Sequence, residues 1–301
     1  MPAWGSLLEE LQDHKGPDGR YISALSVDEL RLKYLKQLSE FTGRNTIAYY
    51  SGWLNNRSHN VDINDSDMTG LMNAMKGLDC SKGLDLILHT PGGYPTAAEG
   101  IVNYLHSKFG NEIRVIVPQM AMSAGTMLAC ASKQIIMGKH SCLGPIDPQF
   151  NNITAAYNIV NEFAQAKAEL SKNPKDKIYW ELQLNKYPVA FLYTVIDSIN
   201  LSGVLTEQWL DKYMLTGNNK ADIAKRIVGQ LNANNKSHSR HFSYEFCKNL
   251  GLNVFALEDD QVLQENVLSV HHSFIITFDV TKATKIIENQ NGMRYVTRQQ
   301  D

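Results

Sequence analysis

The sequence has few cysteines, no long apolar run and little excess charge of either sign. Its 301 residues include four cysteines and no CxxC pair. This pattern indicates free thiols in a reducing compartment rather than a disulfide scaffold or a zinc site. The formal net charge of −2 does not fit a nucleic-acid-binding tail. The few cysteines, the lack of a long apolar run and the near-neutral charge favour an ordinary globular protein that does not bind nucleic acid.

No segment has the roughly 18 consecutive apolar residues that a transmembrane helix requires. The first sixteen residues also lack the basic and apolar segments of a secretion signal. We therefore expect a cytoplasmic protein without a transmembrane segment. Leu7, Leu8 and Leu11 fit a short amphipathic helix. We expect it to dock on its own domain, although a partner subunit or peripheral contact with a membrane stays open.

Apolar residues make up 43% of the chain, which is enough for one large domain or for a large domain and a small one. We expect an N-terminal arm and helix over residues 1–43, a core over 44–216 and a small C-terminal appendage over 217–301. The appendage has a loose helix-helix-wing outline. The near-neutral charge argues against DNA binding by this part.

Short apolar segments alternate with helical patterns through the core. This alternation is typical of parallel βαβ units and predicts the α/β class. The expected strands cover residues 45–53, 84–89, 113–117 and 134–137, and the expected helices cover 96–109, 123–131, 153–170 and most of 178–215.

The flanking segments give more local predictions. Ser26 and Glu29 form a capping box, which predicts the start of a helix. A second helix places Met68, Leu71, Met72 and Met75 on one core-facing side. Two C-terminal segments, 253–258 and 267–278, are predicted strands.

Gly92 and Gly93 follow the predicted strand 84–89. Glycines let the backbone turn sharply where a parallel strand ends, and ligands bind at that end of open α/β sheets. Backbone N–H groups freed there can stabilise a developing oxyanion. The alternative is a plain strand-to-helix turn.

Ser123 holds the equivalent position after the predicted strand 113–117. It is followed by Ala124 and Gly125, which are small enough for a substrate to come close. The N–H of Ala124 is a candidate second oxyanion donor beside that of Gly93. The alternative role for Ser123 is a simple helix N-cap.

Together, the strand–Pro-Gly-Gly–helix and strand–Met-Ser-Ala-Gly–helix units resemble the Clp protease and signal-peptide-peptidase superfamily, which has the crotonase fold. Four longer stretches narrow the resemblance to the serine dehydrogenase proteinase family over about residues 44–190. These stretches are IAYYSGW, GLDLILHTPGG, AMSAGTMLACASK and IIMGKHSCLGPIDPQF.

This resemblance implies a ClpP/crotonase-like catalytic core and a serine endopeptidase that acts on polypeptides. Ser123 would be the nucleophile and form an acyl-enzyme. Gly92, Gly93 and Ala124 would form the oxyanion hole. The resemblance implies no metal and no cofactor, and it implies assembly into a homo-oligomeric ring.

The base that activates Ser123 stays open at the level of sequence. Relatives use a lysine downstream of the turn that reads Gly-Pro-Ile-Asp in this chain, which points to Lys167 or Lys175. A histidine triad would instead combine His140 with Asp147. A neighbouring subunit is a further source. His89, beside the Pro-Gly-Gly turn, is expected to be a buried, hydrogen-bonded side chain.

Three other readings remain. A catalytically silent member of the same fold would bind polypeptides or scaffold a complex. Acyl-CoA chemistry also uses backbone oxyanion donors, but it would leave Ser123 without a role. A metal site is not expected, since the spacing of the candidate ligands does not fit one; these are His238, His241, His271, His272, Cys247 and Asp259.

Overall fold

The computed structural model describes residues 4–12, 24–55, 60–150, 154–232 and 238–299. A largely parallel seven-stranded sheet forms its centre, in the order β10-β5-β3-β2-β1-β11-β12. Its strands are β1 (Asn45–Ser51), β2 (Leu84–His89), β3 (Ile113–Val117), β5 (Gln134–Met137), β10 (Val254–Ala256), β11 (Ala283–Asn289) and β12 (Arg294–Arg298). The α/β class is confirmed.

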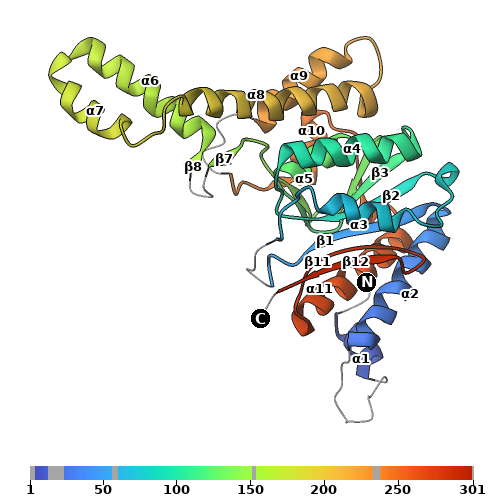
Figure 1. Ribbon diagram of the computed structural model, residues 1–301. Helices are drawn as coiled ribbons and strands as arrows, with labels where there is room; N and C mark the ends of the chain where they lie inside the picture. The colour runs from blue at the N-terminus through green and yellow to red at the C-terminus, as the bar shows by residue number, and fades with distance from the viewer. Residues whose placement is uncertain (1–3, 13–23, 56–59, 151–153, 233–237, 300–301) are drawn as a thin grey trace.

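The central strands β2, β3 and β5 have the bounds that the sequence predicts. Helices cover both faces of the sheet (Figure 1). On one face lie α3 (Asp67–Ala74), α4 (Pro95–Phe109) and α5 (Ala124–Cys130), and on the other lie α2 (Ala24–Thr42) and α11 (Gln261–Val280). Strands buried on both faces have nearly continuous apolar sequences, which is why they are recognisable.

Two helices differ from their predictions. Residues 267–278 are not a strand but the middle of α11, whose first turn is capped by the Asp260 side chain accepting from the Leu263 N–H. Because α11 is buried on most of its sides, its apolar residues mask the helical period. The capping box is also wrong, because α2 begins at Ala24 and Ser26 lies inside it.

One predicted core position is exposed. On α3, Leu71 is buried, and Met68 and Met75 pack against the core. Met72 is 59% exposed, so the prediction that its side chain faces the core is wrong.

The C-terminal third of the chain contributes to the central sheet. Strand β10 pairs with β5, and β11 pairs antiparallel with β1. The helices α9 (Lys220–Leu231) and α10 (Tyr244–Leu250) precede β10. The sheet therefore runs across the boundary expected near residue 217.

The short N-terminal helix α1 (Trp4–Gln12) docks on its own chain, as expected. Leu7 and Leu11 are buried in a small cluster with Val27, Leu30 and Ile276.

A projecting arm extends from the core (Figure 1). It consists of α6 (Ala156–Lys172), the turn η2 (Pro174–Asp176), α7 (Lys177–Leu184) and the start of α8 (Phe191–Trp209). The arm has its own small apolar cluster and also exposes large apolar side chains: Ile178, Tyr179, Leu182, Val189 and Tyr193. None of the helices in the described ranges is long and apolar enough to cross a bilayer.

Candidate active site

A small three-stranded sheet gathers three segments that are distant in sequence. Its order is β4 (Met120–Ala121), β6 (Cys142–Leu143) and β9 (Phe242–Ser243). Strands β4 and β6 are parallel, and β9 is antiparallel to β6. Residues after β4, residues after β6 and residues before β9 therefore lie at the same edge. Ser123, Asp147 and His238 occupy these three segments.

Ser123 has a strained backbone conformation, with φ 50° and ψ −118°. Non-glycine residues with positive φ are uncommon and cluster at functional sites. Its side chain makes no capping hydrogen bond to α5, so the simple N-cap interpretation is wrong. A strained strand-to-helix turn that exposes a serine hydroxyl is the geometry of a nucleophile elbow.

Small residues allow the two βα turns to meet closely. A Cβ at Gly92, which has φ +105°, would lie 2.6 Å from the Ser123 Cβ. A Cβ at Gly125 would lie 2.5 Å from the Thr90 Cγ2. The backbone of Thr90 donates to Met120 O (3.1 Å) and accepts from Met122 N (3.0 Å). The Pro-Gly-Gly turn is thereby fixed against the turn that carries Ser123.

Not all of the expected oxyanion donors are available. The Gly92 N–H donates to Thr90 Oγ1 at 3.1 Å. Within the described residues, the N–H groups of Gly93 and Ala124 have no acceptor. These two amides flank the contact between Gly92 and Ser123, and both can donate to a ligand oxygen.

Asp147 and His238 form a pair at this edge. The Nδ1 of His238 lies 3.0 Å from Oδ1 of Asp147, and the Asp147 side chain is only 6% exposed. Gln149 Nε2 donates to the other carboxylate oxygen at 3.2 Å. A carboxylate on Nδ1 fixes the tautomer and directs Nε2 away from the pair. Sequence reasoning considered His238 only as a metal ligand, because no local motif links it to Asp147.

The predicted lysine bases lie elsewhere. Lys167 is on α6 and Lys175 is in η2, and both are exposed. Figure 1 shows these elements extending away from α5. A single chain therefore does not bring either lysine to Ser123.

His140 also lies apart from Asp147. Its Nε2 is 3.0 Å from Pro118 O, and its Nδ1 is 3.9 Å from a carboxylate oxygen of Glu258. The structure thus pairs Asp147 with His238 instead of His140.

His89 is a buried core residue. Its ring centroid lies 4.4 Å from that of Trp53 and 5.3 Å from that of His271. Its burial is as expected. Neither ring nitrogen has a partner of standard hydrogen-bond geometry among the described residues, and the backbone of Met120 supplies a weaker interaction that acts to raise the pKa of the ring. Burial lowers the pKa of His89 to about 3, which makes it a poor base at neutral pH.

The described residues contain no group of three or more histidine, cysteine or acidic side chains arranged to hold a metal ion. The candidate ligands are spread over the segment before β9, α10, the short 3-10 helix η4 (Leu257–Asp259) and α11.

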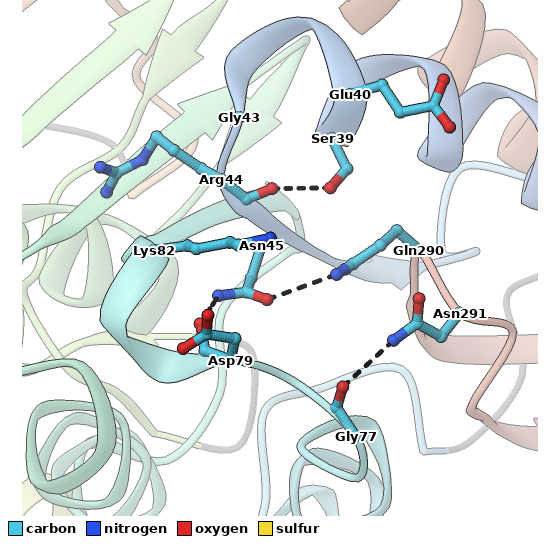
Figure 2. Close-up of a pocket in the computed structure, with 10 residues that line it drawn as sticks. All are labelled: Ser39, Glu40, Gly43, Arg44, Asn45, Gly77, Asp79, Lys82, Gln290 and Asn291. Carbon is cyan, nitrogen blue, oxygen red and sulfur yellow. Dashed lines mark hydrogen bonds between the residues drawn. The ribbon is translucent and has the colours of Figure 1, made fainter.

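A separate polar hollow of about 430 Å³ lies at the amino-terminal end of β1, within the central sheet's strand order and not at its outer strands. Figure 2 shows Asn45, the first residue of β1, in its wall. Its polar groups largely satisfy one another: Asn45 Nδ2 donates to Asp79 O (2.7 Å), and Gln290 Nε2 donates to Asn45 Oδ1 (3.4 Å). Its serine hydroxyl, that of Ser39, donates to Arg44 O at 2.7 Å and makes no bond to a basic side chain of the lining.

Comparison with known proteins finds a family match over the part of the chain that contains Ser123. Residues 58–189 match the family of ClpP-like SDH-type serine proteinases, which confirms the family resemblance over this range. An uncharacterized protein of Methanocaldococcus jannaschii is 40% identical over 109 residues, which are 36% of this chain and 37% of the relative. A second uncharacterized protein of this organism is 28% identical over 194 residues, which are 64% of this chain and 59% of the relative. The matches thus span less than two thirds of either relative.

Proposed function

Because residues 58–189 match the ClpP-like SDH-type serine proteinases, we propose that this chain is a serine endopeptidase acting through Ser123. The observation that carries the proposal is the convergence of a strained serine, a histidine–carboxylate pair and two unpaired backbone amides at one edge of a small sheet. Polypeptide is the substrate class that the family implies.

In the proposed reaction, Ser123 Oγ attacks the peptide carbonyl carbon while His238 Nε2 accepts the hydroxyl proton. Asp147 holds the His238 Nδ1–H and stabilises the imidazolium. The N–H groups of Gly93 and Ala124 donate to the oxygen that becomes negatively charged. The imidazolium then protonates the leaving amine, which leaves an acyl-enzyme that water hydrolyses.

His238 is preferred to the lysines as the base because it already lies at the serine's edge of the small sheet. The Ser123 hydroxyl makes no hydrogen bond to any described residue, so the proposal requires His238 Nε2 to reach it in the complex with substrate. Such tightening on binding is usual for catalytic hydrogen bonds. Lys167 and Lys175 would require the projecting arm of a neighbouring subunit.

We extend the proposal to a ClpP/crotonase-type core in a cytoplasmic, ring-forming homo-oligomer. The exposed apolar side chains of the projecting arm support self-association. Light scattering on the purified protein tests this point, and a monomer at all concentrations would contradict it.

The test of activity is covalent labelling with a fluorophosphonate probe, read by intact mass. The wild type should gain one adduct and Ser123→Ala none. His238→Gln should label at least about a hundredfold more slowly. Lys167→Met and Lys175→Met should label at the wild-type rate.

The outcomes also separate the alternatives. Loss of labelling in a lysine variant would transfer the role of base to that lysine. A wild type that neither labels nor cleaves an unfolded polypeptide would favour the silent polypeptide-binding alternative.

A further inference from the structure

A buried ion pair lies behind the oxyanion turn. Lys285 in β11 and Asp67 in the first turn of α3 approach to 2.6 Å, with side chains that are 1% and 0% exposed. The Tyr49 hydroxyl donates to the second oxygen of Asp67 at 2.6 Å. The pair is therefore shielded from water and held by a third side chain.

Both charged groups also bind the backbone on either side of Ile63. Lys285 Nζ donates to Asp62 O at 2.7 Å. Asp67 Oδ2 accepts from the Asn64 N–H at 3.0 Å. Hydrogen bonds to charged groups are stronger than neutral ones. The backbone at Ile63 is thus fixed from both sides.

Ile63 in turn binds the oxyanion turn. Its N–H donates to Gly92 O at 2.7 Å, and its carbonyl accepts from the Tyr94 N–H at 2.9 Å. A Cβ at Gly93 would lie 2.2 Å from Ile63 O. The direction of the free Gly93 N–H is therefore set by the position of Ile63.

We propose that Lys285 and Asp67 are positioning residues that aim the Gly93 N–H at the oxyanion. This inference rests on the proposed peptidase function. Net stability is a weak reason to keep such a pair, because well-packed apolar residues often stabilise a core as well as a buried ion pair does. Positioning gives the pair a role, since misplacing a catalytic group by about 1 Å can cost about a hundredfold in rate.

The chain offers a matched control. Arg31 and Glu288 form another buried pair, with 2.8 Å between Arg31 Nε and Glu288 Oε2 and fully buried side chains. Glu288 is also on β11, but Arg31 bonds to Thr277 and Asp28, not to the segment around Ile63. Both pairs can be broken by replacing the cation with methionine.

The experiment compares Lys285→Met with Arg31→Met in steady-state peptide hydrolysis, at a temperature where both are folded by near-ultraviolet circular dichroism. Lys285→Met should lower kcat by about a hundredfold and change KM by less than about threefold, because the lost contact acts in the transition state. Arg31→Met should keep kcat within about threefold. Equal kcat values in the two variants would overturn the proposal.

Amide hydrogen exchange gives a readout that does not depend on activity. The Ile63 and Tyr94 amides should exchange at least about tenfold faster in Lys285→Met than in Arg31→Met. An inactive wild type would contradict the proposed peptidase function, and hydrogen exchange alone would then test the positioning role. If both amides kept their protection in Lys285→Met, the positioning role would be overturned. If Lys285→Met does not fold, Asp67→Asn replaces it under the same criteria.

Discussion

His238 and Asp147 are hydrogen-bond partners at 3.0 Å although 91 positions separate them. The pairing of β6 with β9 brings their two segments together. Asp147 is buried, and His238 is partly exposed. One partner can therefore reach a substrate while the other stays fixed in the protein.

Replacing Asp147 by asparagine tests the orienting role of this carboxylate. We expect kcat to fall by about a thousandfold or more with little change in the melting temperature, since Asn keeps the shape but holds the wrong histidine tautomer. Steady-state hydrolysis of a peptide ester measures the effect. A kcat within tenfold of wild type would show that His238 does not depend on Asp147.

Gly92→Ala tests the close contact with Ser123. The new Cβ would lie 2.6 Å from the Ser123 Cβ at a φ of +105°, so we expect a loss of about 1–3 kcal/mol in the free energy of unfolding together with loss of probe labelling. Gly229→Ala is the control, because it lies in α9 with no atom within 4 Å of the added Cβ. It should stabilise by up to about 1 kcal/mol. Equal stability of the two variants in urea titrations would contradict the packing argument.

The buried histidines make stability sensitive to acid. Burial lowers the pKa of His89 to about 3, and burial lowers that of His271 well below its usual value. Between pH 6.5 and about 3 the unfolded chain binds protons that the folded chain excludes. The free energy of unfolding should therefore fall as the pH falls, by up to about 1.4 kcal/mol per pH unit for each histidine.

Urea titrations between pH 7 and pH 4 on wild type and His89→Phe measure this dependence. The free energy of unfolding of His89→Phe should fall less steeply as the pH falls, because the variant lacks the contribution of the buried His89. His241→Gln, which changes an exposed histidine, is the control. Parallel curves for wild type and His89→Phe would refute the assignment.

The thiols should differ in reactivity. Cys80 is half-buried, whereas Cys130, Cys142 and Cys247 are buried. Burial raises the pKa of Cys142 to about 11 and that of Cys247 to about 12, and the thiolate is the reactive form. Ellman's reagent at neutral pH should modify only Cys80 in the native protein, and Cys80→Ser should abolish that signal. Rapid modification of a second thiol would contradict the burial.

The central strands and the two βα turns were predictable because their signals are local. Strand β2 is mostly apolar, with Leu86, Ile87 and Leu88 in succession, and Gly92 and Gly93 follow it within four residues. The strain at Ser123 was not predictable, because serine is also among the preferred helix N-cap residues. Only the backbone angles separate the two roles.

His238 and Lys285 were beyond the reach of sequence patterns. His238 meets Asp147 through the pairing of β6 with β9, whereas Lys285 meets Asp67 where α3 packs against β11. Neither residue lies in a recognisable motif. The strand predicted over residues 267–278 failed for a related reason. Burial by α2 and the sheet, not local spacing, sets the composition of α11.

The order of these segments along the chain has a consequence for synthesis on the ribosome. The turns with Gly93 and Ser123 emerge early, but His238 and Lys285 are made much later. Strand β11, which pairs with β1, closes the sheet only after most of the chain has been translated. A nascent chain therefore carries Ser123 before His238 and Lys285 have been made, and under the proposed function this delay would keep an unfinished chain from cutting itself or its neighbours.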